Sequence, residues 1–254
     1  MQNSIGRRQQ PAPSGSIRAI TMKSSTRVIP NRRLLLVYAI PYFVYVGIAS
    51  LFAGYLPVEL VYALRLFVVS GLIVWAWRWY VPLKGPKSPW TSMVIGTGVG
   101  LAGAAFWVVL LWPFAAKNVE PWTDLAFVLR LVAAGMIVPV FEELLMRGFI
   151  LRLTVQWDNA RKEGDKDPFG SALNKRSVIS VKPGAWTCWA IAISTIAFTL
   201  GHHVREWPAA IVFGFIMAFL WIYRKDLLSC VTAHGVANIT LALVVRATGN
   251  WGLW

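Results

Sequence analysis

Three charged side chains lie close together in an otherwise apolar run. Residues 138–150 include Glu142, Glu143 and Arg147. A charge at the centre of a membrane helix costs roughly 2.5–3.5 kcal/mol on an insertion scale, so each of these groups needs a partner or a function. Glu143 and Arg147 are four residues apart with the acid first, a spacing that favours an ion pair on one helix face. Glu142 lies about 100° round the helix without a charged partner, which makes it a candidate general base.

Histidine and asparagine side chains lie in two later apolar runs. Phe198, His202 and His203 close the first run, and His234 and Asn238 lie four residues apart in the second. On a helix the last two side chains share a face and could offer two donors to one oxygen. Because a buried polar group is expensive when it is alone, coincidence is the weaker explanation for this set.

Together these groups could hydrolyse a peptide bond. The reaction needs a base that activates water, a group that holds the water, and donors for the oxyanion. Glu142 with His202 could supply the first two, and His234 with Asn238 could supply the third.

Two other hydrolase chemistries use the same region. Zinc held by Glu142, His202 and His234 would give a catalytic metal site, although the helical His-Glu-x-x-His arrangement is missing. A nucleophilic Ser194 is less favoured because it lies eight residues from His202 with no evident base beside it, and a nucleophilic Cys230 because it leaves both glutamates unexplained.

The composition is typical of a polytopic membrane protein. Of the 254 residues, 57% are hydrophobic and 14% are charged, with a mean hydropathy of +0.56. Soluble domains have roughly 25% charged residues. The net charge of +14 does not indicate nucleic-acid binding, because the basic residues lie in the N-terminal tail and in alternate loops. Many of the 14 tryptophans lie near the ends of apolar runs, as in interfacial belts.

The apolar runs predict an all-α transmembrane bundle of about seven spans, within a range of six to eight. The spans are expected at residues 34–53, 58–77, 92–111, 125–151, 185–201, 209–223 and 227–245. Nineteen of the 25 Lys and Arg lie in the tail and in segments on the same side, and three lie on the opposite side. This distribution predicts a cytoplasmic N-terminus.

These spans place the two candidate catalytic motifs at different depths. Glu142 falls toward the inner side of its span, and His202 falls near the outer end of its own. A kink at Pro139, or a helix that runs past Leu153, would bring the two side chains closer.

The chain divides into a tail and one membrane domain. Residues 1–33 carry seven Lys and Arg and no acidic residue, which predicts a disordered cytoplasmic tail. Residues 34–254 form the expected transmembrane domain, with a motif-bearing core at about 125–246. The polar segment 156–183 is expected to be a solvated connector. Gly96 and Gly100 indicate close helix packing rather than a dinucleotide site, because they lie inside an apolar run.

The three motifs together resemble the CPBP family of intramembrane glutamic proteases, which comprises CAAX proteases and bacteriocin-processing enzymes. The family pattern is Glu-Glu-x-x-x-Arg, then Phe-x-x-x-His, then His-x-x-x-Asn or Asp, each on a separate helix. This sequence has the motifs in that order, as Glu142-Glu143-x-x-x-Arg147, Phe198-x-x-x-His202 and His234-x-x-x-Asn238. The double histidine at 202–203 and the aromatic C-terminal segment 247–254 look similar to a bacterial subgroup associated with exosortase systems.

The resemblance implies that Glu142 activates water with help from His202, and that His234 and Asn238 form the oxyanion hole. It also implies four supporting residues, namely Glu143, Arg147, Phe198 and His203. The expected substrate is a membrane-anchored protein or a lipidated peptide. The expected location is the bacterial inner membrane, with the lipid bilayer as surroundings, no nucleic-acid partner and no required cofactor.

Two functions from other classes could use the same buried residues. A transporter or channel could relay protons through them, and a non-catalytic family member could act as a scaffold for membrane partners. Paired repeats would favour transport and an incomplete motif would favour a scaffold, and the sequence has neither feature. The sequence therefore favours the protease.

Overall fold

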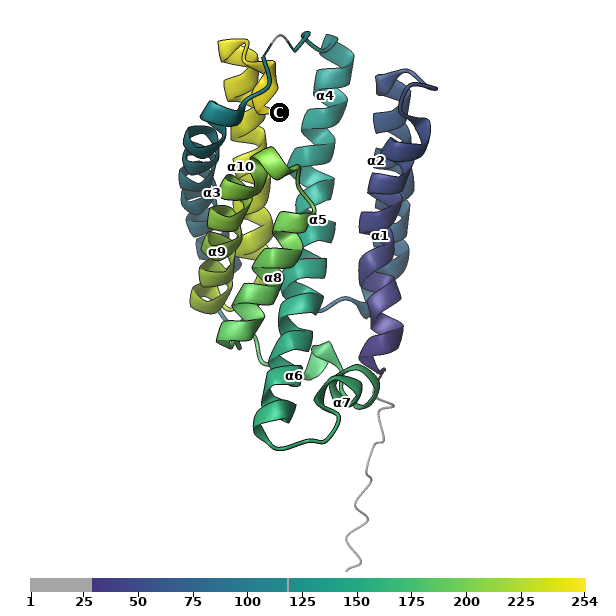
Figure 1. Cartoon of the computed structure of the whole chain (residues 1–254), viewed down its shortest axis with the longest axis vertical. Coiled ribbons are helices and arrows are strands. Elements are labelled where there is room, and N and C mark those ends of the chain that lie inside the picture. Colours follow the sequence, from purple (N-terminus) through teal and green to yellow (C-terminus); the bar gives the residue numbers. More distant parts are fainter. Residues whose placement is uncertain (1–28, 118) are drawn as a thin grey trace, which may run out of the picture.

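The structure, a computed structural model, describes residues 29–117 and 119–254, and in this part of the chain every regular element is a helix (Figure 1). The α-helices are α1 (Asn31–Phe52), α2 (Val58–Ala76), α3 (Pro89–Leu111), α4 (Asp124–Val132), α5 (Val138–Glu143), α6 (Leu151–Lys162), α7 (Pro168–Lys175), α8 (Cys188–Leu200), α9 (Trp207–Arg224) and α10 (Leu227–Thr248). Two π-helical segments, η3 (Ala133–Ile137) and η4 (Leu144–Ile150), join α4, α5 and α6. The 3₁₀ turns are η1 (Trp77–Trp79), η2 (Trp112–Phe114), η5 (Val178–Ser180), η6 (Val204–Glu206) and η7 (Trp251–Leu253).

Six helices in the described part are long and apolar enough to cross a membrane. They cover Asn31–Phe52, Val58–Trp79, Pro89–Phe114, Asp124–Lys162, Val204–Arg224 and Leu227–Thr248. This confirms the predicted all-α bundle. The span predicted at 185–201 is wrong in length, because α8 has 13 residues. Such a helix rises about 20 Å, less than the roughly 30 Å of a hydrocarbon core.

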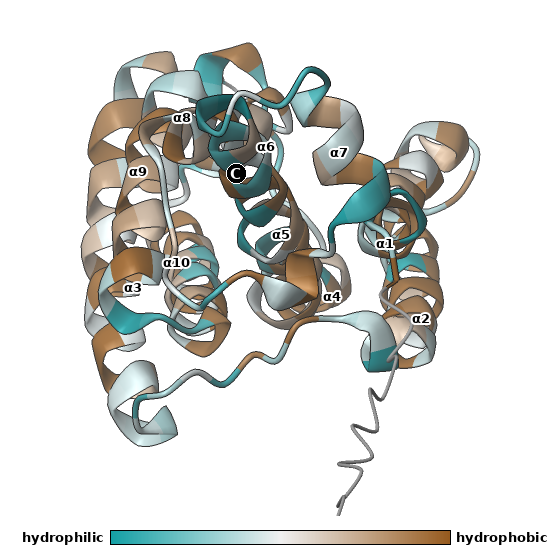
Figure 2. Ribbon diagram, turned by 90° about the horizontal axis from the view of Figure 1, so that it is seen from below, coloured by the Kyte–Doolittle hydropathy of each residue, from teal (hydrophilic) through white to brown (hydrophobic). Residues whose placement is uncertain are grey.

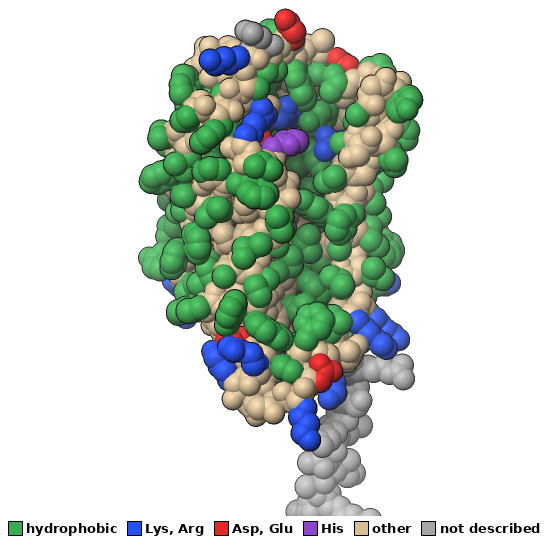
Figure 3. Space-filling model, viewed as in Figure 1, with side chains coloured by type: hydrophobic (Ala, Val, Ile, Leu, Met, Phe, Trp, Pro, Cys, Tyr) green, Lys and Arg blue, Asp and Glu red, His purple; other side chains and the backbone are tan. Residues whose placement is uncertain are grey.

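The outer surface of the bundle is apolar. Large side chains such as Leu36, Phe67, Val109 and Phe219 are well exposed. In Figure 2 hydrophobic residues dominate the outer helices, and hydrophilic residues concentrate around α6. Figure 3 shows a hydrophobic middle band with charged side chains toward the ends. Since large exposed apolar patches are unusual in soluble monomers, this surface faces lipid, and the protein is a multi-pass integral membrane protein.

The fourth span is one continuous helix that runs well past its predicted end at residue 151. It covers Asp124–Lys162, and several polar residues after Leu151 are buried rather than solvated. The Nη1 group of Arg152 donates to the carbonyl oxygens of Val178 and Val181 at 3.1 and 3.0 Å. The segment 156–183, predicted as a connector, therefore contains the end of α6 and all of α7, packed below the bundle (Figure 1).

The N-terminal end of α1 is tied to this lower part. Residues 1–28 of the predicted tail lie outside the described residues, but Asn31 already begins a helix. Its buried amide donates to Gln156 Oε1 at 2.7 Å and to the Ala172 carbonyl at 2.8 Å, and its Oδ1 accepts from the Val178 amide at 2.6 Å. Asn31 therefore belongs to the folded domain rather than to a tail.

Helices α3 and α10 pack closely through glycine, as predicted. A Cβ atom on Gly96 would lie 2.7 Å from the Ser229 carbonyl oxygen, and one on Gly100 would overlap the carbonyl oxygen of Ala233. Gly98 faces away from α10, and a Cβ atom added there would have no neighbour within 4 Å. The close approach brings the middle of α10 into the centre of the bundle.

This packing gives a stability prediction with a matched control. Gly100→Ala is expected to destabilise the protein by about 1–3 kcal/mol, because the added methyl group forces α3 away from α10. Gly98→Ala should be neutral or slightly stabilising, since alanine is the better helix former. Thermal unfolding of both variants in detergent would test this, and equal transitions would contradict the packing.

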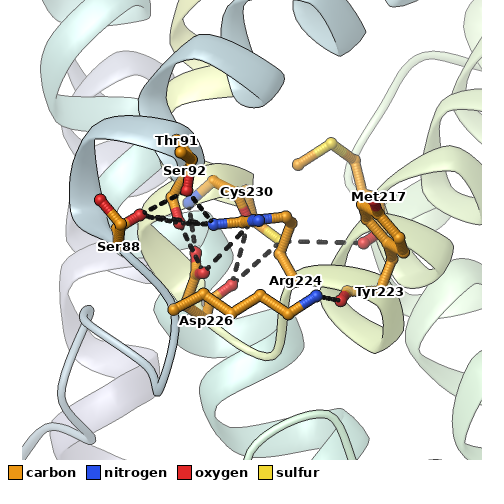
Figure 4. A network of polar contacts seen from close by, with 10 residues as sticks. Ser88, Thr91, Ser92, Met217, Tyr223, Arg224, Asp226 and Cys230 are labelled. Atoms are coloured by element: carbon orange, nitrogen blue, oxygen red, sulfur yellow. Dashed lines mark hydrogen bonds and ion pairs between the residues drawn. The ribbon is translucent and has the colours of Figure 1, made fainter.

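A polar network fixes the ends of α3, α9 and α10 at the lower end of the bundle (Figure 4). Asp226 caps α10 by accepting from the Ser229 amide at 2.7 Å, and its Oδ2 accepts from the Ser92 hydroxyl at 2.7 Å. Arg224 donates to the hydroxyl oxygens of Thr91 and Ser92 at 2.8 and 2.7 Å. Because Arg224 and Asp226 are both buried, the turn between α9 and α10 is held rigidly against α3.

Candidate active site

Six polar side chains from four parts of the bundle line one cavity of about 180 Å³. We call it the Glu142 cavity. Its polar lining consists of Arg130, Glu142, His202, Glu206, His234 and Asn238. Helices α3, α9 and α10 contribute apolar walls, and Leu253 and Trp254 of the C-terminal segment complete the lining.

The lengths of two helices explain how Glu142 and His202 reach one depth. Glu142 lies near the middle of the continuous helix Asp124–Lys162. His202 follows the short helix α8, which starts near the lower end and stops well below the level at which α4 begins (Figure 1). The helix that runs past Leu153 and the short α8 therefore remove the difference in depth that simple spans predict.

The π-helical segments determine which side chains of the long helix face its neighbours. The helix widens at η3 just before Glu142, and the amide of Asn238 donates to the carbonyl oxygen of Ala134, within η3, at 2.8 Å. A Cβ atom on Gly235 would lie 2.5 Å from the carbonyl oxygen of Gly135, so α10 packs tightly against η3. Such π segments occur frequently at functional sites. Here the segment brings His234 and Asn238 close to the face that carries Glu142.

A buried ion pair lies directly behind the cavity. The Arg147 Nη1 group donates to Glu143 Oε1 at 3.2 Å, and both side chains are fully buried. The Nη2 group donates to the Gly214 carbonyl on α9 at 3.0 Å. Glu143 Oε1 also accepts from His234 Nδ1 at 2.9 Å. The pair predicted from spacing alone therefore connects η4 with α9 and α10.

Both cavity histidines have their Nδ1 atoms occupied. His234 Nδ1–H donates to Glu143, and His202 Nδ1–H donates to the Phe198 carbonyl oxygen at 2.9 Å. Each ring therefore has its Nε2 atom free for chemistry. The Nε2 atom of His234 lies 3.8 Å from Glu142 Oε2, and the Glu142 side chain remains 14% exposed. A water molecule in the cavity could thus contact a carboxylate and an imidazole together.

Aromatic rings hold the two imidazoles in place. The Phe198 ring lies 4.6 Å from the His202 ring and 5.8 Å from the His234 ring, measured between centroids. Trp107 contacts His202 at 5.3 Å and Phe213 contacts His234 at 5.5 Å. These contacts restrict the rotamers of both histidines.

Most of the residues predicted from the motifs lie together in the structure. Glu142, Phe198, His202, His234 and Asn238 line the cavity. Glu143 and Arg147 lie behind it and hold His234. His203 is exposed and does not line the cavity, and its backbone N–H donates to Glu206 Oε2 at 3.3 Å.

Two charged cavity residues were not predicted from the motifs. Arg130 lies inside a span, and its charge in an apolar run was the signal that could have identified it. Glu206 lies in the short segment between α8 and α9, where a carboxylate gives no such signal.

The zinc alternative can be compared with the arrangement of possible ligands. Among the described residues, no group of three or more His, Cys, Asp or Glu side chains could hold a metal ion. Glu142, His202 and His234 line the same cavity, but their donor atoms do not converge on one point. A catalytic zinc needs three protein ligands at about 2.0–2.2 Å. The side chains therefore do not fit a zinc site as they are arranged.

Metal removal gives a direct test of this arrangement. If the cavity hydrolyses peptide bonds, as the motifs predict, we expect 1,10-phenanthroline to leave the cleavage rate of the purified protein unchanged within about twofold, because the described residues form no metal ligand set. Loss of activity that zinc restores, measured against a non-chelating phenanthroline isomer, would instead support the zinc version.

Comparison with known families identifies the motif-bearing part of the chain. Residues 124–240 match the family model described as type II CAAX prenyl endopeptidase Rce1-like, so this segment, from α4 into α10, is similar to a peptidase family. The match confirms the predicted resemblance at the level of this domain. Comparisons with curated proteins and with solved structures gave no significant match.

Proposed function

We propose that this chain, in which residues 124–240 form an Rce1-like type II CAAX prenyl endopeptidase domain, is an intramembrane endopeptidase. It hydrolyses a peptide bond in a membrane-anchored protein or a lipidated peptide. The observation that carries the proposal is the Glu142 cavity, in which a carboxylate, two imidazoles and an amide surround a space large enough for water. The catalytic centre consists of Glu142, His202, His234 and Asn238.

In the first step, Glu142 takes a proton from a water molecule that His202 Nε2 holds. The resulting hydroxide adds to the carbonyl carbon of the scissile peptide bond. This assignment is supported by the hydrogen bond from His202 Nδ1 to Phe198, which leaves Nε2 free and fixes the ring. General-base activation of this kind contributes roughly 10²–10⁴-fold to a rate.

In the second step, the tetrahedral oxyanion accepts hydrogen bonds from Asn238 and His234. Asn238 Nδ2 has two N–H groups, and the bond to Ala134 uses one of them. Glu143 accepts from His234 Nδ1–H and so fixes the ring, and His234 donates to the oxyanion from Nε2–H as the doubly protonated imidazolium. Collapse of the intermediate breaks the C–N bond, and Glu142 returns its proton to the leaving amine.

The cellular setting is part of the proposal. The excess of Lys and Arg on one side supports a cytoplasmic N-terminus in a bacterial inner membrane. The double histidine at 202–203 and the aromatic residues of segment 247–254 support a place in the exosortase-associated bacterial subgroup. Neither feature requires that the substrate is prenylated.

The test compares wild-type and Glu142→Gln protein on membrane proteins of the native cell. Both purified proteins are incubated with membranes, and mass spectrometry identifies new peptide termini. We expect termini that appear with the wild type and not with the variant, and these also identify the substrate. If a folded Glu142→Gln protein produces the same termini at the same rate, Glu142 is not the base.

A further inference from the structure

Arg130 is a cation without an anionic partner inside the Glu142 cavity. Three arginines lie within the central parts of the spans, and two of them have hydrogen-bond partners: Arg65 Nε donates to the Tyr45 carbonyl at 3.0 Å, and Arg147 donates to Glu143 and Gly214. Within residues 29–117 and 119–254, Arg130 makes no hydrogen bond and no ion pair within 4.0 Å, although Glu206 lines the same cavity and attracts it from a longer distance. An intramembrane charge without a partner indicates a functional site.

Aromatic rings hold the Arg130 side chain but do not neutralise it. The guanidinium carbon lies 4.4 Å from the ring centroid of Trp122 and 4.2 Å from that of Trp254. Cation–π contacts orient a guanidinium and leave its N–H groups available. Glu206, the other carboxylate near this end of the cavity, is already used by Arg205 at 3.7 Å and by the His203 amide at 3.3 Å.

The long helix aligns Arg130 with the proposed catalytic base. Arg130, Ala134, Val138 and Glu142 all line the cavity at intervals of four residues. In a regular α-helix, positions four residues apart differ by a rotation of about 40° around the helix axis. The wider turn of η3 offsets part of this rotation, so one face carries both charged groups. Twelve residues correspond to about 18 Å along the axis.

We propose that Arg130 is an anion-binding subsite of the Glu142 cavity that takes a carboxylate of the substrate three to five residues from the scissile bond. An extended peptide advances about 3.3 Å per residue, so the axial separation sets the upper limit of this range. Both side chains line the same cavity, so their end groups can lie closer together than their backbone positions, which sets the lower limit. The fork of N–H groups on a guanidinium matches a carboxylate. The carboxylate belongs either to the C-terminus of the substrate or to an acidic side chain.

Because the subsite is assigned to the substrate of the endopeptidase, this proposal rests on the proposed function. The binding of a carboxylate to Arg130 can nevertheless be measured without catalysis. The full-length Glu142→Gln protein is titrated in detergent by calorimetry with three probes. They are acetyl-Ala-Ala-Ala with a free C-terminal carboxylate, the C-terminal amide of the same peptide, and the amide of acetyl-Ala-Ala-Asp. We expect at least one carboxylate probe to bind about tenfold or more tightly than the neutral amide. The stronger of the two identifies the source of the carboxylate.

Variants of the two stacked arginines make the test specific. Arg130→Gln in the same background should abolish the preference for the carboxylate. Arg65→Gln should keep it, because Arg65 stacks 3.7 Å from the Tyr45 ring but does not line the cavity. Equal binding of acid and amide, or a preference that survives Arg130→Gln, would overturn the proposal.

The same variants separate binding from folding when catalysis is present. For a substrate peptide with a carboxylate in the stated range, Arg130→Gln should raise KM about tenfold or more and change kcat by less than about threefold. Arg130→Lys should recover part of the effect, because it keeps the charge. An equal loss for the acid and amide forms of the peptide would assign Arg130 a structural role. Cleavage lost in Glu142→Gln but unchanged in Arg130→Gln would leave the proposed function intact and reject the subsite alone.

Discussion

Replacing Glu142 by Gln is expected to lower kcat by about 10²–10⁴-fold or more and to leave the fold unchanged. The amide has nearly the shape of the carboxylate but cannot accept a proton from water. The side chain is partly exposed to the cavity, and its only described ion contact is the one at 3.8 Å to His234 Nε2, so little packing is lost. Single-turnover cleavage of the identified substrate would measure the effect, with thermal unfolding as the control for stability.

Glu206→Gln is the matched variant for this experiment. Glu206 is a second carboxylate in the same cavity, and it lies next to Arg205 rather than next to a cavity histidine. The expected loss of activity is below about tenfold. If the two Gln variants lose activity equally, the cavity needs negative charge as such, and Glu142 has no special role as the base.

Glu143→Ala is expected to destabilise the protein by about 3–5 kcal/mol. The substitution leaves Arg147 buried without its acid and removes the acceptor of His234 Nδ1, and the desolvation of an unpaired buried charge is what makes such variants unstable. Chemical or thermal unfolding in detergent would give the change in the free energy of unfolding. Activity should also fall, because the orientation of His234 depends on Glu143.

Two controls separate this burial effect from the loss of any ion pair. Lys162→Ala removes a pair with Asp158 in which the lysine is 59% exposed, and it should cost less than about 1 kcal/mol. The double variant Glu143→Ala/Arg147→Met removes both buried charges and should recover part of the stability. A Glu143→Ala protein as stable as Lys162→Ala would contradict the role of the buried pair.

The sequence predicted the residues of the cavity better than their connections. The spacing of Glu143 and Arg147 was sufficient for their ion pair, because both lie on one helix. The link from Glu143 to His234 joins residues 91 positions apart, and no local pattern reports such a contact. The lengths of the helices also depended on tertiary contacts. Polar residues such as Arg152 extend the fourth span because carbonyl groups of a distant segment satisfy them.

The missed residue Arg130 shows a different limit. Its charge was visible in the sequence, but only the packed structure shows that no described carboxylate lies within ion-pair distance of it, although Glu206 lines the same cavity. A sequence pattern can predict an ion pair on a helix, because the two residues have a characteristic spacing. A charged residue without a partner has no such spacing to indicate it.

The two π-helical segments also constrain how this part of the chain can be aligned with relatives. Removing one residue from η3 would restore the α-helical hydrogen-bond pattern. It would also rotate the helix before η3 by about 100° relative to the helix after η3. The upper part is packed through Phe127 against Trp251 and Trp254, and the lower part is bound through Arg147 and Arg152, so neither part can rotate freely. Between Asp124 and Lys162, single-residue gaps should therefore be selected against, and length variation should fall in the segments outside this helix.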